Sequence, residues 1–312
     1  MRLVFLGSPP FATPILERLL SSERHEVLAL VTPPDRPRGR GRAVVRSALA
    51  EMADEADVQV VQPASTKDPA FLEALAGFEP EALMVASYGE ILRTDVLELC
   101  PHGALNVHGS LLPRWRGASP IQRAIAAGDA ETGVSIQRMV LALDAGDVLL
   151  EKRTSIGPQE TAADLFERLS LLGADAAEEA LDLLAGGGAV YTPQDESLVT
   201  LAPKLTKDDG RIDFTLPAAA IARHVRAMTT WPGARTTLPD GRDLVVLEAR
   251  PVQQAGGAEA PGTLLDGATL LVRTGDGEAV RLARVKPAGK AAMADDAFQR
   301  GARVEPGAVL GG

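Results

Sequence analysis

The chain has 312 residues, of which 46% are hydrophobic and 24% are charged. This length favours two domains, and the single Cys100 excludes an internal disulfide and a cysteine-rich zinc site, as is typical of a cytoplasmic protein. The net charge of −10 argues against a nucleic-acid partner, but it is concentrated in residues 1–203, because residues 204–312 hold 15 Lys and Arg against 13 Asp and Glu.

The first third of the chain alternates apolar stretches of strand length with amphipathic stretches of helix length, beginning with a strand that runs into Gly7. The predicted strands are 2–7, 25–32, 58–61 and 82–86, and the predicted helices are 14–21, 47–56, 68–75 and 95–99. Continuous apolar strands that alternate with helices are typical of a parallel sheet in an α/β fold. We expect no signal peptide, and no apolar run approaches the ~20 residues of a membrane-spanning helix.

A basic segment interrupts this pattern at residues 33–42. Its four arginines, Arg36, Arg38, Arg40 and Arg42, alternate with Pro and Gly, and no apolar residue follows before Ala43. Such a segment cannot bury one of its faces, so we expect an exposed, mobile loop. By itself, a charge run of this kind is most often a solvated surface.

Polar residues then end a buried strand at residues 105–108. Asn106 and His108 lie two positions apart, so their side chains point to the same face of the strand. A loop containing Pro113 follows, and a helix is predicted to begin near Pro120. Polar groups at the end of a central strand are where open α/β sheets bind ligands.

The remainder of the chain contains a long predicted helix at 161–184, an extended polar stretch at 191–201 and a short helix at 218–228. Five short segments then read as strands separated by turn signals: 234–238, 243–251, 262–265, 269–274 and 279–286. Five strands at this spacing suit a small β-barrel.

The pattern Asn-x-His-x-Ser-Leu-Leu-Pro-x-x-Arg-Gly over residues 106–117, followed by Asp144-Ala145-Gly146, resembles the signature of the folate-dependent formyltransferase family, above all its methionyl-tRNA formyltransferase branch. A lone Asn-x-His, or an Asp in a turn, is more often structural, but the whole block is specific. Residues 34–41 also resemble an insertion of that branch, which enters the acceptor end of the initiator tRNA. The family commonly has an acidic residue where Pro10 stands, and the resemblance thins between 252 and 261.

The resemblance implies an α/β, Rossmann-like formyltransferase domain at 1–190, a linker at 191–206 and an OB-like β-barrel domain that binds tRNA at 207–312. Asn106 and His108 suit stabilisation of the negative charge that develops on a formyl oxygen. Asp144 can orient His108 and take the proton of the attacking amine. The histidines, at 25, 102, 108 and 224, show no metal-ligand spacing, and we expect no metal.

Two further groups of residues are expected to bind substrates. The folate-binding residues belong to the turns that follow two neighbouring strands: Ser87, Tyr88, Gly89, Ile91, Ser110, Leu111, Leu112 and Pro113. The tRNA-binding residues are basic: Arg36, Arg38, Arg40, Arg42, Lys204 and Lys207. Arginine suits this role because its guanidinium pairs with phosphates and stacks on unpaired bases.

The implied function is transfer of the formyl group of 10-formyltetrahydrofolate to the α-amino group of methionine on initiator Met-tRNA, for translation initiation, by a cytoplasmic monomer without a membrane partner. One alternative is a formyltransferase acting on another amine, such as a nucleotide sugar or glycinamide ribonucleotide. That enzyme would keep Asn106, His108 and Asp144 but would not need the arginine segment or the barrel. A non-catalytic RNA-binding protein is the second alternative, and it would not need those three residues.

Overall fold

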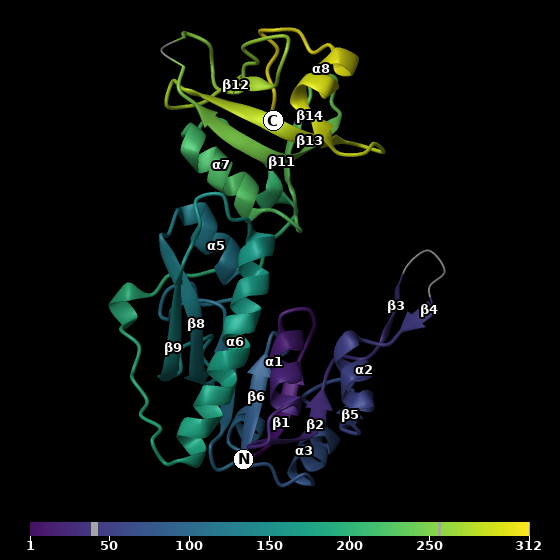
Figure 1. The fold of residues 1–312 in the computed structure, drawn as a ribbon, viewed down its shortest axis with the longest axis vertical. Coiled ribbons are helices and arrows are strands. Elements are labelled where there is room, and N and C mark those ends of the chain that lie inside the picture. Colours follow the sequence, from purple (N-terminus) through teal and green to yellow (C-terminus); the bar gives the residue numbers. More distant parts are fainter. Residues whose placement is uncertain (39–42, 255–256, 312) are drawn as a thin grey trace. The chain divides into compact units, whose positions relative to one another are not determined.

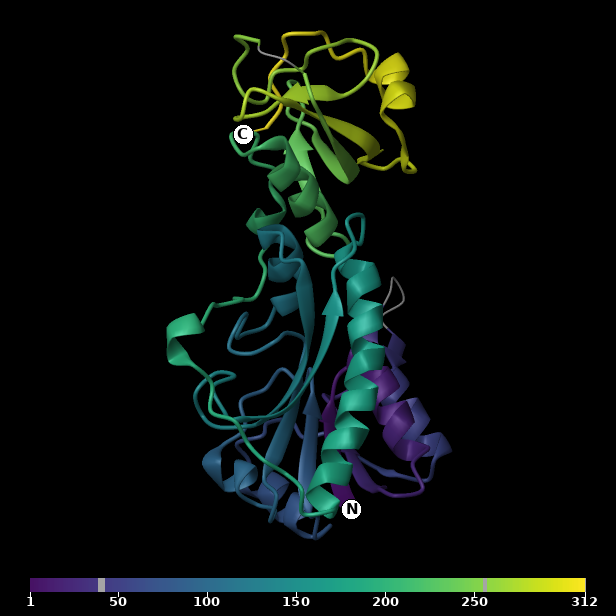
Figure 2. The same ribbon diagram turned by 60° about the vertical axis from the view of Figure 1, so that its left-hand side comes forward.

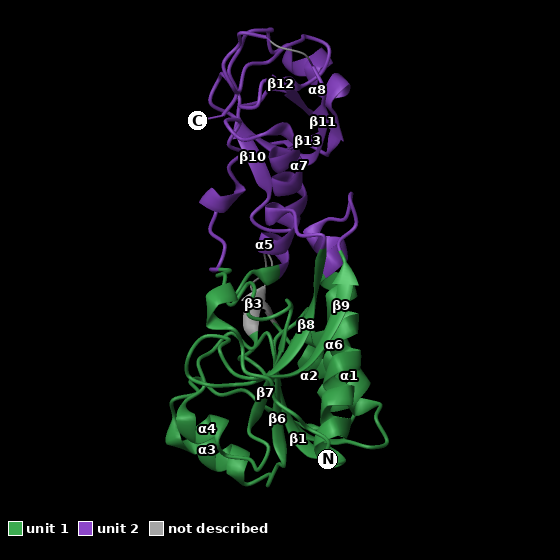
Figure 3. Ribbon diagram, turned by 90° about the vertical axis from the view of Figure 1, so that its left-hand side faces the viewer, with its two compact units in different colours: residues 1–120, 131–155, 166–202 green, residues 121–130, 156–165, 203–312 purple. Residues whose placement is uncertain are grey.

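The computed structural model describes residues 1–38, 43–254 and 257–311. The chain divides into two compact units, which Figure 3 shows in green and purple. Unit 1 comprises residues 1–120, 131–155 and 166–202, and unit 2 comprises residues 121–130, 156–165 and 203–312. Within the described ranges, no helix combines the length and apolar character needed to cross a membrane.

Unit 1 is built on a seven-stranded sheet with the strand order β5-β2-β1-β6-β7-β8-β9 (Figure 1). Its strands are β1 (Arg2–Gly7), β2 (Glu26–Val31), β5 (Gln59–Val61), β6 (Ala82–Ala86), β7 (Ala104–His108), β8 (Glu131–Arg138) and β9 (Val148–Ser155). The first five in this order are parallel, whereas β8 is antiparallel to both of its neighbours. The predicted Rossmann-like α/β fold is confirmed, and the carboxyl ends of its parallel strands are where such sheets bind ligands.

One face of this sheet is covered by α1 (Ala12–Leu20) and the unit 1 part of α6 (Ala162–Ala185), which runs along the strands in Figure 2. Gly173 of α6 makes the close approach possible. A Cβ atom at this position would lie 3.0 Å from a methyl carbon of Val107 in β7 and 3.4 Å from the end of Ile15 in α1. The side chains of β7 that point to this face therefore belong to the core.

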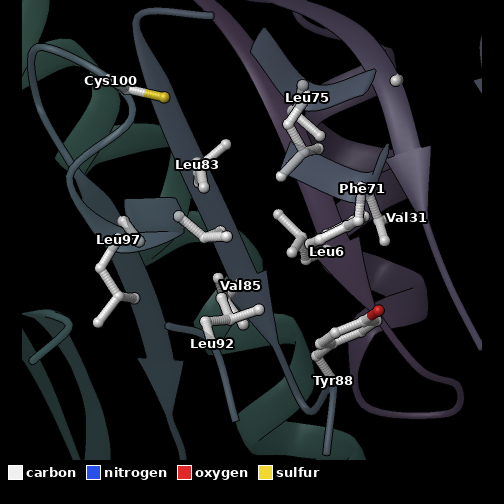
Figure 4. Packing of buried hydrophobic residues seen from close by; sticks show 14 residues of the cluster. Leu6, Val31, Phe71, Leu75, Leu83, Val85, Tyr88, Leu92, Leu97 and Cys100 are labelled. Carbon is white, nitrogen blue, oxygen red and sulfur yellow. The ribbon is translucent and has the colours of Figure 1, made fainter. Parts of the chain in front are cut away.

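The opposite face is covered by α3 (Pro69–Ala76) and α4 (Thr94–Leu97) over β2, β1 and β6. Asp68 begins α3, since its side chain accepts a hydrogen bond from the Ala70 amide and Pro69 takes the first helical position. Fourteen buried residues form the apolar cluster beneath these helices, and Figure 4 shows them. They are Val4, Leu6, Ala29, Val31, Phe71, Leu75, Leu83, Val85, Tyr88, Leu92, Val96, Leu97, Cys100 and Ala104.

The single cysteine of the chain lies in this apolar cluster. Burial raises the pKa of the Cys100 thiol to about 11. Cys100 therefore behaves as a small apolar side chain rather than as a nucleophile.

The basic segment differs from the expected irregular loop. Residues Arg36–Arg38 form β3 and residues Ala43–Val45 form β4, and the two strands pair as an antiparallel hairpin. Such a hairpin is held by main-chain hydrogen bonds, so it does not require the buried apolar face that the segment lacks. Arg40 and Arg42 lie outside the described residues.

Unit 2 contains a curled, antiparallel five-stranded sheet with the order β10-β11-β13-β12, to which β14 adds beside β13. Its elements are α5 (Pro120–Ala127), α7 (Ala218–Ala227), β10 (Ala234–Thr237), β11 (Asp243–Val252), β12 (Leu271–Arg273), β13 (Ala279–Pro287), β14 (Met293–Ala294) and α8 (Asp295–Ala302). Two register shifts between β11 and β13 bend the sheet. The predicted OB-like barrel is confirmed as a half-barrel of this kind.

Two details of unit 2 differ from the strand pattern expected from the sequence. Residues 262–265 make isolated bridges, Thr263 with Val309 and Leu264 with Val272, instead of a full strand. Helix α8 was not expected. Buried Asp295 at its start pairs with Arg281 of β13 at 2.7 Å, and this pairing joins the helix to the sheet.

Candidate active site

The candidate site lies on the α3/α4 face of the sheet, at the place where the apolar cover ends. Ala104 of β7 is the last member of the apolar cluster, and the next side chains on this face of β7 and β8 are polar. Asn106 is paired with Gln137, and His108 is paired with Ser135. Because paired residues of neighbouring strands point to the same face, these four polar side chains form one patch.

Asp144 reaches this patch from the loop between β8 and β9. Its φ of 48° lies in the left-handed region, which costs a residue with a side chain roughly 1–2 kcal/mol. One carboxylate oxygen, Oδ2, accepts a hydrogen bond from the Gly117 amide at 2.8 Å, and the other, Oδ1, accepts one from Gln137 Nε2 at 2.9 Å. The carboxylate is thereby fixed by two donors from different segments.

The three residues singled out from the sequence come together around this carboxylate. His108 Nδ1 lies 3.7 Å from Asp144 Oδ2, and Asn106 Nδ2 lies 3.5 Å from Asp144 Oδ1. His108 is buried, whereas Asn106 is half-buried. Asn106 and Asp144, which is also half-buried, are therefore more accessible to a ligand than His108.

The second ring nitrogen of His108 donates a hydrogen bond to the main-chain oxygen of Trp115 at 3.0 Å. Both ring nitrogens of His108 thus face oxygen atoms. With a hydrogen on Nε2 alone, the lone pair of Nδ1 is directed at the Asp144 carboxylate, whereas a second hydrogen turns the contact into an ion pair. His108 thus presents an N–H donor beside Asn106, aimed in this structure at the Trp115 oxygen.

The loop after β7 is held in place by Ser135. The Ser135 hydroxyl donates to the Ser110 carbonyl at 2.8 Å and accepts from the Leu112 amide at 3.0 Å. The Ser110 hydroxyl itself donates to the Arg114 carbonyl at 2.6 Å. Ser110 and Leu112 are buried, so their side chains shape the loop, while Leu111 and Pro113 are half-buried.

The turn after β6 combines a buried and an exposed part. The Tyr88 ring belongs to the apolar cluster, and burial, aided by the charge of Glu90, raises the pKa of its hydroxyl to about 12. Ser87 and Gly89 are exposed, and both have a positive φ. Ile91 is 79% exposed, which is unusual for a large apolar side chain.

The loop that carries Asp144 also exposes apolar side chains, since Leu141 is 66% exposed and Leu143 is 65% exposed. Met139, at the start of this loop, packs against the same apolar cluster as Tyr88. Both loops thus combine a contact with the apolar cluster and exposed apolar side chains. A flat, partly apolar ligand would cover these groups.

A cavity of about 290 Å³ lies next to this region and was not expected from the sequence. Its walls are Leu112 and Pro113, residues 148–151 of β9, and residues 192–195. Residues 192–195 come from the stretch expected to be a linker, and a polar, extended sequence gives no signal that it will line a cavity. Within this stretch Thr192 pairs with Val148 of β9.

The residues expected to bind tRNA lie apart from these groups in the sequence. Arg36 and Arg38 are on β3, and Lys204 and Lys207 are exposed residues of unit 2. Among the residues that the structure describes, no cluster of His, Cys, Asp and Glu side chains could hold a metal ion.

Comparison with known proteins gives the class of this chain. Residues 1–181 match the formyl transferase family model, and residues 204–303 match the model of the formyl transferase C-terminal domain. The chain therefore belongs to the formyl transferase family of enzymes, in the branch of the methionyl-tRNA formyltransferases, because its similarity to relatives of that name extends over nearly its whole length.

Two of these relatives illustrate the similarity. The chain is 47% identical to the methionyl-tRNA formyltransferase of Anaeromyxobacter dehalogenans, covering 94% of each chain. It is 44% identical to that of Solibacter usitatus, covering 100% of this chain and 99% of the relative.

Solved structures share the fold at lower identity. HypX from Aquifex aeolicus in complex with tetrahydrofolic acid aligns with 98% of this chain and 48% of its own, with a TM-score of 0.63 and 21% identity. The sugar 3N-formyl transferase WlaRD aligns with 93% of this chain and 99% of its own, with a TM-score of 0.67 and 14% identity.

Proposed function

We propose that this protein transfers the formyl group of 10-formyltetrahydrofolate to the α-amino group of methionine on initiator Met-tRNA, in the cytoplasm, for translation initiation. The observation that carries the proposal is the convergence of Asn106, His108 and Asp144 at one strand end. It occurs in a chain whose full-length relatives are named methionyl-tRNA formyltransferases.

The residues present fit a folate. Exposed Ile91, Leu141 and Leu143 would cover the flat ring of the donor, which supplies an activated formyl group when bound. The exposed turn at 87–91 and the loop at 110–113 would offer main-chain groups to the polar edge of the ring. Tyr88 would contribute through its main chain, because its own ring lies in the apolar cluster.

The three polar residues divide the proposed chemistry. When the amine attacks the formyl carbon, negative charge develops on the formyl oxygen, and the half-buried amide of Asn106 can donate a hydrogen bond to it. His108 would add a second donor by exchanging the Trp115 carbonyl for that oxygen. The carboxylate of Asp144 would orient His108 and accept the proton of the amine, directly or through water, for return to the departing folate nitrogen.

Acceptor choice is tested with purified protein and three amines: Met-tRNA, a nucleotide-linked amino sugar and glycinamide ribonucleotide. We expect formyl transfer from 10-formyltetrahydrofolate to Met-tRNA, with the other two amines at least 100-fold poorer in kcat/KM. Binding of tRNA without transfer would identify an RNA-binding protein instead. Preferential transfer to a small amine would support formyl transfer as the reaction but contradict Met-tRNA as its acceptor.

The arginine segment gives a second test of the acceptor. Replacing Arg38, Arg40 and Arg42 with Ala should lower kcat/KM for Met-tRNA at least 10-fold. It should also reduce the dependence of tRNA binding on salt, because binding through fewer phosphate contacts releases fewer counterions from the tRNA. Tetrahydrofolate affinity, measured by calorimetry, should stay within 2-fold. Stability should change by at most ~0.5 kcal/mol, as is usual for surface substitutions.

The matched control replaces three exposed arginines elsewhere in unit 1, Arg24, Arg93 and Arg153, and so removes the same charge. We expect its salt dependence to resemble that of the unaltered protein. Equal salt slopes for the two triple variants would show that the segment is only a solvated charge run. We propose that exposed Lys204 and Lys207 of unit 2 also contact tRNA, and Ala substitutions test them in the same assay.

A further inference from the structure

Gln194 connects the Asp144 loop to a buried arginine. Its amide nitrogen donates to the main-chain oxygen of Asp144 at 2.9 Å and to that of Gly146 at 2.6 Å. Its amide oxygen accepts from Arg116, from Nε at 3.0 Å and from Nη2 at 2.9 Å. The side chain thus uses both hydrogens of its amide nitrogen and both lone pairs of its oxygen.

This pattern admits one orientation of the amide. Two carbonyl oxygens require the nitrogen end of the side chain, and a guanidinium requires the oxygen end, so a flipped amide would face four mismatched partners. Arg116 is itself 6% exposed and pairs with Glu196 at 2.7 Å. The main chain of Arg116 also pairs with the segment that carries Gln194, through Thr200 and Ala202.

Apolar packing gives the tip of the Asp144 loop little support. Asp144 has a left-handed φ, and the side chains of Leu141 and Leu143 are exposed instead of packed. Gly146 approaches β8 so closely that a Cβ would lie 1.6 Å from the Arg138 carbonyl oxygen, which leaves no room for a side chain to anchor the loop. Hydrogen bonds must therefore keep the Asp144 carboxylate beside His108.

We infer that Gln194, clamped by Arg116, is a positioning residue for the proposed transfer reaction: it fixes the loop so that the Asp144 carboxylate stays beside His108 and Asn106. Gly117 strengthens this arrangement, because it follows Arg116 directly and donates its amide hydrogen to Asp144 Oδ2. One buried guanidinium and its neighbouring peptide thus support Asp144 from both its main chain and its side chain. The inference rests on the proposed function where it is tested by the rate of formyl transfer, but not where it is tested by the NMR signals of His108.

The test is Gln194→Glu. This variant keeps the length of the side chain and its contact with Arg116, but it places an oxygen opposite the carbonyls of Asp144 and Gly146. We expect kcat for formyl transfer to Met-tRNA to fall at least 10-fold, with both KM values within 2-fold. The imidazole ¹⁵N signals of His108, one of four histidines, should shift in the free protein, where no substrate is involved.

Gln299→Glu of unit 2 is the matched control. Gln299 is buried, and its amide nitrogen also donates to two main-chain oxygens, those of Gly267 and Val304. This control should lose stability as Gln194→Glu does, yet keep kcat and the His108 signals unchanged. Glu196→Gln removes the exposed partner of Arg116 and should alter kcat by less than 2-fold.

If Gln194→Glu does not fold, Gln194→Met is the second variant. It removes the contacts with Arg116 and with the two main-chain oxygens without adding a charge, and we expect the same decrease in kcat and the same shift of the His108 signals. Unmoved His108 signals together with a kcat within 2-fold of the unaltered protein would overturn the inference. So would equal losses of kcat in Gln194→Glu and Gln299→Glu. Absence of formyl transfer in the unaltered protein would contradict the proposed function alone, because the His108 signals still report the position of Asp144.

Discussion

The two halves of the α3/α4 face are covered in different ways. Over β2, β1 and β6 the cover consists of helices, and the contact is an apolar cluster drawn largely from consecutive elements. Over β7 and β8 the cover consists of loops, and the contacts are hydrogen bonds from Gly117, Gln137 and Gln194 to the main chain or carboxylate of one loop. A sheet that keeps polar groups accessible at a strand end cannot cover them with apolar helices, so hydrogen bonds must replace packing there.

The difference predicts that the apolar half carries stability and the polar half carries activity. Leu83→Ala, in the centre of the apolar cluster, should have the largest effect, a loss of about 2–5 kcal/mol in the free energy of unfolding. Urea titration of unit 1 signals measures this loss. Activity per folded molecule should change less than 3-fold, and a loss of kcat above 10-fold in folded protein would contradict the division.

His108→Ala should give the opposite result. Removing the ring donor beside Asn106 should lower kcat by 100-fold or more, about 2.7 kcal/mol or more in the activation barrier, with folding retained. Steady-state kinetics and circular dichroism measure the two properties. His102→Ala, six residues earlier in the chain, is the control and should keep full activity. Near-normal turnover of folded His108→Ala protein would remove His108 from the mechanism.

Asp144→Asn should follow with a loss of about 100-fold in kcat. An amide offers one oxygen where the carboxylate offers two, so either the Gly117 amide or Gln137 Nε2 would face another donor. Tetrahydrofolate binding, measured by calorimetry, should be largely kept. The control is Asp147→Asn in the same loop. The side chain of Asp147 is exposed, so we expect this substitution to leave kcat unchanged. Lost folate affinity with normal turnover at saturation would make Asp144 a binding residue only.

Ser135→Ala should have the smallest effect of the four substitutions, and it should lower both stability and activity. It removes the hydroxyl that holds Ser110 and Leu112, which leaves a buried carbonyl and a buried amide unpaired. We expect a loss of about 1–3 kcal/mol in stability and a decrease of a few-fold in kcat, as the loop after β7 loosens. Chemical denaturation and kinetics on the same preparation test this pairing, and a loss of kcat comparable with that of His108→Ala would show that Ser135 acts in the reaction itself.

Much of this organisation was predictable from the sequence. The apolar strands and amphipathic helices of residues 1–108 specify a parallel sheet, because their side chains must be buried on both faces of each strand. The positions of Asn106 and His108 followed from strand alternation alone. Membership of the formyltransferase family, and with it the expectation that Asp144 completes the group, followed from the motif at 106–117 and its spacing to Asp144.

Other features depend on contacts between residues far apart in the chain. The β3–β4 hairpin was not expected, because main-chain pairing leaves no mark in the side-chain pattern. Likewise, the stretch at 191–201 reads as a polar connection, yet it lies in unit 1 and supplies Gln194. The sequence alone identified the proposed reacting groups by their type and spacing. Only the tertiary structure decided what holds them in place, because a hydrogen bond to a main-chain oxygen fifty residues away depends on the folded path of both segments.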